Sequence, residues 1–203
     1  MSESPDTDLT KDSSHPVGGI QIVVVGGGAA GFFAAIAAAE ANLKANVTLL
    51  EKSAHVLAKV RISGGGRCNV TQACFDPREL SKRYPRGGRA LIGPLTRFGP
   101  ADTIEWFESR GVPLKIEEDG RVFPKSNSSQ SIVDVLEQEA KRLGVRLKLS
   151  TGIKAIRPTD AGFSLQTDAG DVSVSKMIVA SGGHPNLNAY DFLKLLNHKV
   201  INP

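Results

Sequence analysis

The fold is decided by residues 20–31, which read Ile20-Gln21-Ile22-Val23-Val24-Val25-Gly26-Gly27-Gly28-Ala29-Ala30-Gly31. The β-branched run shows little alternation, which is typical of a parallel strand buried on both faces. Glycines follow at once with the spacing G-x-G-x-x-G, and the Ala-rich segment Ala29–Ala41 has high helix propensity. Because this turn directly follows a strand and opens a helix, it predicts a dinucleotide-binding site.

Each small residue of this turn has an expected role. Gly26 allows the tight turn, Gly28 lets the backbone approach a pyrophosphate, and Gly31 permits close packing of helix on strand. Ala29 and Ala30 lie in the first helical turn, where free N–H groups and the partial positive charge favour phosphate. The residues therefore predict that the phosphates of a dinucleotide bind at this helix N-terminus.

A second strand, Asn46–Leu50, completes a strand–helix–strand unit and is closed by Glu51. Glu51 stands 20 residues after Gly31, where a carboxylate accepts hydrogen bonds from ribose hydroxyls. An acidic residue there disfavours the 2′-phosphate of NADP. It leaves NAD and FAD open as alternatives.

Two further glycine clusters follow. The first is Ser63-Gly64-Gly65-Gly66-Arg67, followed closely by Asn69, and it indicates a place where a flat or charged ligand meets backbone. Pattern alone leaves a flexible surface loop equally open. The second is Ser181-Gly182-Gly183, which follows the buried-looking strand Met177–Ala180. By itself this cluster favours a simple tight turn.

The remaining pattern outlines one domain. We expect residues 1–18 to be a disordered tail and residues 19–203 to form a single nucleotide-binding domain. Residues 52–100 read as irregular, followed by helices over 101–110 and 131–143. From Val145 the period changes to two over residues 145–149, 153–156, 162–167 and 171–174, which predicts an antiparallel meander. Another helix is expected to begin at Asp191. The predicted fold class is α/β, a Rossmann-like domain with an antiparallel β-meander.

Composition limits the functions that we expect. The net charge is +4 with a pI near 9.1, and the most basic run, Lys82–Arg89, is predicted to be a solvated loop rather than a nucleic-acid site. No apolar stretch suggests a membrane span or a signal peptide, so a cytoplasmic location is expected. The four histidines are scattered without metal-ligand spacing, so we expect no metal.

The two cysteines, Cys68 and Cys74, have five residues between them. Flavin disulfide reductases carry a redox pair soon after the second strand with one residue fewer between. We therefore expect two free thiols, and keep a disulfide reductase as an alternative.

Together these residues resemble the BaiN-like flavoproteins, the family that includes aminoacetone oxidases, from about Ile20 to Pro203. The most specific part is Ile62-Ser63-Gly64-Gly65-Gly66-Arg67-Cys68-Asn69-Val70-Thr71. Gly120–Ser126 and Val179–Pro185 are similar to two further family segments, with Ser181 where Thr is usual. Gln72 replaces the usual Asn.

The resemblance implies an FAD-dependent oxidoreductase with a nucleotide-binding domain of glutathione-reductase type, NAD(P)H-linked or oxidase-type, acting on an unknown small molecule. It implies that the Gly26–Gly31 turn holds the pyrophosphate and that Glu51 holds the adenosine ribose. The other cofactor-binding residues that it implies are Lys52, Lys59, Ser63, Gly64, Gly65, Gly66, Arg67, Asn69, Ile153, Gly182 and Gly183. No catalytic residue is indicated.

Family members continue into a substrate domain and a final FAD-binding segment. Relative to the family this chain is therefore expected to be incomplete. We expect it to form a homodimer or to pair with a complementing C-terminal half, and to turn over little by itself. A third reading is a non-catalytic dinucleotide-binding fragment that pairs with another chain.

Overall fold

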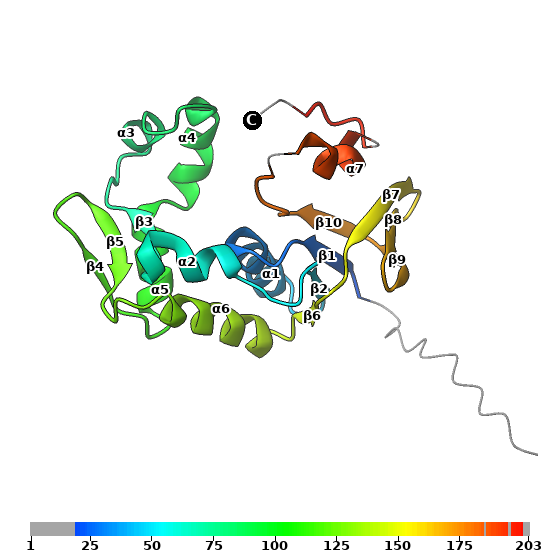
Figure 1. Ribbon diagram of the computed structural model, residues 1–203, viewed down its shortest axis with the longest axis horizontal. Helices are drawn as coiled ribbons and strands as arrows, with labels where there is room; N and C mark the ends of the chain where they lie inside the picture. Colours follow the sequence, from blue (N-terminus) through cyan, green and yellow to red (C-terminus); the bar gives the residue numbers. More distant parts are fainter. Residues whose placement is uncertain (1–18, 185, 195, 201–203) are drawn as a thin grey trace, which may run out of the picture.

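The computed structural model describes residues 19–184, 186–194 and 196–200. Its centre is a parallel sheet with the strand order β10-β1-β2-β6 (Figure 1). Strand β1 pairs with β10 on one side and with β2 on the other, so that Val23 lies between Met177 and Thr48. The bounds are β1 Gln21–Val25, α1 Ala29–Ala41, β2 Asn46–Leu50, β6 Arg146–Lys148 and β10 Lys176–Val179. The predicted strand–turn–helix–strand unit is confirmed residue for residue from Ala29 to Leu50.

The sheet is covered on both faces, which explains why β1 is apolar without alternation. Val24 and Leu49 are buried in one cluster with α1 and with α6 (Gln130–Arg142). Val23 and Leu50, one position away on each strand, belong to a second cluster with Ile156, Leu165 and Val174 of the meander. Because successive strand residues point to opposite faces, the two clusters identify three layers: helices, parallel sheet and meander.

The meander is confirmed as an antiparallel sheet of β7 (Ile153–Thr159), β8 (Gly162–Thr167) and β9 (Gly170–Val174). The prediction that Val145–Leu149 opens this meander is wrong. Residues Arg146–Lys148 form β6, which pairs in parallel with β2 at the edge of the central sheet. A helix that returns the chain to a neighbouring parallel strand is the usual crossover, and α6 supplies it. The alternation in 145–149 reflects an edge strand, since Leu147 and Leu149 are 42% and 40% exposed.

The prediction of an irregular region over residues 52–100 is also wrong. This part holds α2 (Ala58–Gly66), β3 (Thr71–Gln72), α3 (Pro77–Ser81) and α4 (Gly88–Arg97). Strand β3 joins β5 (Arg121–Pro124) and β4 (Leu114–Ile116) in a second antiparallel sheet of order β3-β5-β4. Figure 1 shows α3 and α4 standing apart from the central sheet, beyond β3.

Helix α5 (Pro100–Glu108) packs against α1 through an aromatic cluster. The Trp106 ring lies with its centroid 4.6 Å from that of Phe33 on α1 and 4.8 Å from that of Phe107. The Arg110 guanidinium stacks over Trp106 at 4.1 Å and forms ion pairs with Glu40 and Glu139. The cluster therefore ties α1, α5 and α6 together on the helical side of the sheet.

The described residues after β10 contain only two short helical elements. A 3-10 turn, η1 (Leu187–Tyr190), leads into α7 (Asp191–Lys194), so the helix expected at Asp191 is present as about one turn. Residues 1–18, which we predict to be a disordered tail, lie outside the described residues.

Candidate dinucleotide site

The first and third glycine motifs meet at the carboxyl edge of the parallel sheet. The Ala180 N–H donates to Val25 O at 2.8 Å, and the Gly26 N–H donates to Leu50 O at 2.8 Å. The Glu51 N–H continues the ladder to Lys148 O at 2.9 Å. The ends of four parallel strands are thus aligned, which is where α/β sheets bind nucleotides.

The glycines of the first turn differ in what surrounds them. A Cβ on Gly26, whose φ is +109°, would lie 2.4 Å from Ala180 O, and a Cβ on Gly31 would lie 1.8 Å from Gly26 O. A Cβ on Gly28 would have no atom within 4 Å. The protein therefore packs tightly around two of these positions and leaves space at the third, where the pyrophosphate is expected.

The N-terminus of α1 faces this space without a competing group. Gly28 is the N-cap residue, no side chain caps the helix, and the first turn holds no acidic residue. The Phe32 N–H bonds back to Gly28 O at 3.0 Å, while Ala29 and Ala30 are exposed. The N–H groups before Phe32 and the helix dipole are thus available to an anion.

Glu51 is held firmly at the end of β2. Its Oε2 accepts from the Gly27 N–H at 2.6 Å, and its Oε1 accepts from the Ser53 N–H at 2.8 Å. Partial burial alone would raise the pKa of Glu51, but these backbone donors outweigh it and lower the pKa. The group is therefore an ionised acceptor at neutral pH, and each oxygen keeps a lone pair for a ribose hydroxyl. The sequence places Gly27 in this turn but gives it no role of its own, whereas in the structure its N–H orients the Glu51 carboxylate.

The second glycine cluster ends α2 with a kink. Gly64, Gly65 and Gly66 have φ values of +56°, +68° and +83°. A Cβ on Gly64 would lie 2.8 Å from both Asn69 N and Phe123 Cε1, whereas Gly65 and Gly66 face open space. The cluster is thus a folded turn with open space beside two of its glycines, rather than the flexible loop that the pattern left open.

The polar side chains of this cluster are used within the protein. The Arg67 guanidinium stacks on Phe123 at 3.9 Å and forms an ion pair with Glu117 at 2.6 Å. The Ser63 hydroxyl donates to Val60 O at 2.9 Å, and the Asn69 amide faces Thr71 O and Val122 O. These side chains fix the turn, and the Gly66 carbonyl oxygen accepts from the Ser129 N–H at 2.8 Å, so a ligand can approach only through the open space beside Gly65 and Gly66.

Lys59 connects the second motif to the third. Its Nζ donates to Gly183 O at 3.2 Å, and Gly182 has a φ of +72°. Ile153 is half-buried at the start of β7, and the Thr151 N–H donates to Glu51 O at 2.8 Å, so this segment runs beside Glu51. Lys52 is exposed, with its Cβ close to Gly152. The structure therefore gathers Lys52, Ile153 and Glu51 on one side of the turn and Lys59, Gly182 and Gly183 on another.

The cysteine environment is unlike that of a reactive thiol. Cys68 is buried and Cys74 is half-buried, and both are free thiols. Burial raises the pKa of the Cys68 thiol, and the interaction with the Ser63 side chain counters this only in part. Reactive cysteines have lowered pKa values.

Two kinds of feature are absent from the residues that the structure describes. No group of three or more His, Cys, Asp or Glu side chains in this part of the chain could hold a metal ion. No helix in the same residues is long and apolar enough to cross a membrane.

Comparison with known proteins supports the reading of the glycine motifs. The chain is 32% identical over 163 residues to the 3-dehydro-bile acid delta(4,6)-reductase of Clostridium scindens, covering 80% of this chain and 39% of that protein. It is 29% identical over 172 residues to the ribosomal RNA dihydrouridine synthase of Escherichia coli, covering 84% and 42%. The chain thus spans about two fifths of the length of these relatives.

The fold is shared with solved structures. The open conformation of a flavocytochrome c3 fumarate reductase superposes with a TM-score of 0.60 at 23% identity, covering 84% of this chain and 35% of that one. Residues 20–203 match the model of the HI0933-like protein Rossmann domain. The chain therefore belongs to the HI0933-like Rossmann-domain family, the FAD-dependent family that its glycine motifs resemble.

Proposed function

We propose that this chain binds FAD along the carboxyl edge of β10, β1 and β2, and that the protein uses it as an oxidoreductase. The observation that carries the proposal is the turn after β1. Gly26 and Gly31 are closed in by backbone atoms, Gly28 faces empty space, and the uncapped N-terminus of α1 points into that space. Membership of an FAD-dependent family supports the choice of FAD over NAD.

Each part of the edge has a distinct task in this proposal. The N–H groups at the start of α1 bind the pyrophosphate, and the ionised Glu51 carboxylate accepts from the adenosine ribose. Gly65 and Gly66 leave open space for the flavin side, while the Arg67–Glu117 pair keeps their turn in place. Bound FAD supplies the redox chemistry, and the protein positions it and tunes its surroundings.

The electron donor and the substrate are separate proposals. We infer an NAD(P)H-linked or oxidase-type reaction on a small molecule, because the family is FAD-dependent and two relatives bear the names of a reductase and a synthase. Adding NADH or NADPH anaerobically to the FAD-loaded protein and following the oxidised flavin band tests the donor. Bleaching by neither nucleotide would contradict the NAD(P)H-linked form and leave the oxidase form.

The cofactor itself is tested by identifying what the purified protein holds. The protein is denatured by heat, and the released ligand is separated by chromatography beside FAD, FMN and NAD standards. We expect FAD, either retained from the cell or taken up when offered. Recovery of NAD, or of FMN without FAD, would contradict the proposal.

The cysteine pair offers a second candidate function, a disulfide reductase, and the buried Cys68 speaks against it. Thiols are titrated in the denatured protein with and without prior reduction, and the folded, reduced protein is examined for a thiolate–flavin charge-transfer band. We expect two titratable thiols in both samples and no such band. Two sulfurs that become titratable only after reduction, together with that band, would favour the disulfide reductase.

Nucleic acid is tested separately because one relative is named for ribosomal RNA. The exposed cationic residues Arg78, Lys82, Arg83, Arg89 and Arg97 lie on α3, α4 and their connection, away from the sheet edge. We propose that they form a solvated surface. Filter binding of ribosomal RNA over a salt series would contradict this if binding were tight and weakened steeply with salt.

A further inference from the structure

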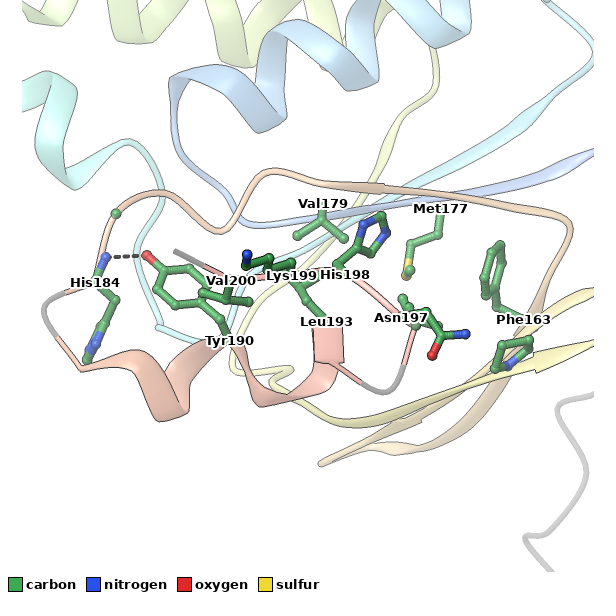
Figure 2. Close-up of a pocket in the computed structure, with 13 residues that line it drawn as sticks. Phe163, Met177, Val179, His184, Tyr190, Leu193, Asn197, His198, Lys199 and Val200 are labelled. Atoms are coloured by element: carbon green, nitrogen blue, oxygen red, sulfur yellow. Dashed lines mark hydrogen bonds between the residues drawn. The ribbon is translucent and has the colours of Figure 1, made fainter. Parts of the chain in front are cut away.

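The loop that leaves β10, residues 181–184, is held by side chains from two other elements. Tyr190 of η1 donates its hydroxyl hydrogen to Gly182 O at 3.0 Å and accepts from the His184 N–H (Figure 2). Lys59 of α2 donates to Gly183 O at 3.2 Å. Three consecutive residues of the loop are thus fixed through backbone groups.

These contacts occupy carbonyl oxygens of the loop and leave several of its N–H groups without a hydrogen-bond acceptor among the described residues. The carbonyl oxygens of Gly182 and Gly183 are bound by side chains, whereas the N–H groups of Ser181, Gly182 and Gly183 have no acceptor among the described residues. Gly182 is in the left-handed region with a φ of +72°. Successive free N–H groups around such a residue form a concave donor site for an anion or a carbonyl oxygen.

The partly buried ring of Tyr190 fixes the position of its hydroxyl group. Tyr190 is half-buried and lines a cavity of about 820 Å³ together with Met177, Val179 and Leu193. Figure 2 shows the ring between this cavity and the loop, with the hydroxyl turned to the backbone of His184. Since one oxygen both donates and accepts, removing it frees two loop residues while the ring can stay in place.

We propose that Tyr190 is a positioning residue, which holds the 181–184 loop so that its N–H groups face the flavin half of bound FAD. This rests on the proposed function. The loop begins beside the pyrophosphate turn, because Ala180 O crowds Gly26. Its other anchor, Lys59, belongs to the helix that ends in the open Gly65 and Gly66 turn. The loop therefore lies between the two parts of the proposed FAD site.

The test uses Tyr190→Phe, with Tyr84→Phe as the matched control, since these are the two tyrosines of the chain and Tyr84 lies between α3 and α4. Binding of FAD and of ADP is measured by calorimetry, because ADP lacks the flavin half. Amide hydrogen exchange of residues 181–184 is measured without ligand. We expect Tyr190→Phe to weaken FAD binding about tenfold, as for two neutral hydrogen bonds, to speed exchange in the loop, and to leave ADP binding unchanged.

Each outcome is decisive for Tyr190. Unchanged FAD binding and unchanged loop exchange in Tyr190→Phe would overturn the inference while leaving the FAD proposal standing. Equal loss of FAD and ADP binding, or a fall in the urea unfolding midpoint that Tyr84→Phe does not share, would identify a general structural role and overturn it as well. If the unaltered protein binds ADP but no FAD, the proposed function itself fails, and this inference fails with it.

Discussion

The two glycine-rich turns of the site, Gly26–Gly31 and Gly64–Gly66, are built in different ways. The first is shaped by its own β-α-β unit and by the chain that leaves β10, and two of its glycines, Gly26 and Gly31, are closed in by backbone. The second is shaped by residues fifty or more positions away, since Phe123 crowds Gly64 and Glu117 holds Arg67. The first turn is packed into the core at Gly26 and Gly31. The second is a surface turn held in place by side chains from other segments of the chain.

The same comparison separates two uses of glycine. In each turn at least one glycine is crowded, and at least one faces open space. A crowded glycine is needed by the fold, because a side chain would displace neighbouring backbone. An open glycine is needed only if a ligand comes close. Substitutions at the two kinds of position should therefore change different measurements.

The largest effect is expected at Gly31. A Cβ there would lie 1.8 Å from Gly26 O, so Gly31→Ala must push α1 away from β1. We expect a loss of at least about 3 kcal/mol in the free energy of unfolding, at or beyond the upper end for overpacking. Urea denaturation measures it. Stability equal to that of the unaltered protein would show that this turn is looser than described.

Gly28→Val is the opposite case. Gly28 has an ordinary φ of −87° and open space around its Cβ position. Stability should change by less than about 1 kcal/mol, while FAD binding should fall more than about a hundredfold, because the side chain occupies the expected pyrophosphate position. Calorimetric titration with FAD measures it. Stoichiometric flavin in this variant would contradict the assignment of the turn.

In the second turn the expected effects are smaller. Gly65→Ala places a side chain at a φ of +68° with no clash, which should cost about 1 kcal/mol of stability. Gly64→Ala adds a clash with Phe123 and should cost more. If Gly65 faces the flavin, Gly65→Ala should also weaken FAD binding several-fold and leave ADP binding unchanged. Equal unfolding midpoints for the two variants would contradict the distinction between crowded and open positions.

The smallest effect concerns the acid stability of Glu51. Its pKa is lowered from the ordinary value of 4.5, since the backbone donors outweigh desolvation. A carboxyl group of this kind stabilises the folded state above its unfolded pKa, and this contribution is lost as the pH falls through its lowered folded pKa. The unaltered protein should thus lose more stability than Glu51→Gln between neutral pH and pH values below 4.5. Solvent screening keeps the difference below about 1 kcal/mol. If the urea unfolding midpoints of the two proteins fell by the same amount across this pH range, the prediction would be contradicted.

The first turn could be predicted from sequence because the strand, the glycines and the helix that form it follow one another in the chain. Residues Gln21 to Leu50 form strand, turn, helix and strand in one uninterrupted unit, and the glycine spacing reflects that geometry directly. The meander could also be predicted, because each of its hairpins connects neighbouring segments. The alternating pattern of residues 145–149 led to the wrong prediction that they belong to this meander. An exposed edge strand of the parallel sheet, such as β6, alternates in the same way.

The remaining features depend on contacts that no local pattern reports. Strand β3 has two residues and exists through its pairing with β5, so the second sheet was not predicted. The partner of Arg67 is Glu117, which only the fold brings near. The same holds for Tyr190, whose hydroxyl reaches a loop that was itself assigned by resemblance. Sequence could thus indicate the glycine-rich backbone that we propose meets the cofactor, but not which side chains hold that backbone.

The packing of Trp106 on α5 against Phe33 on α1 has a consequence for fluorescence. Trp106 is the single tryptophan of the chain, so its indole fluorescence comes from one known position. The ring is fixed against Phe33, near the start of the helix whose N-terminus faces the proposed pyrophosphate position. Indole emission overlaps the absorption of oxidised flavin, so a bound flavin would quench it by resonance energy transfer. The protein therefore carries its own unlabelled reporter, in which cofactor binding and unfolding change one emission spectrum in different ways.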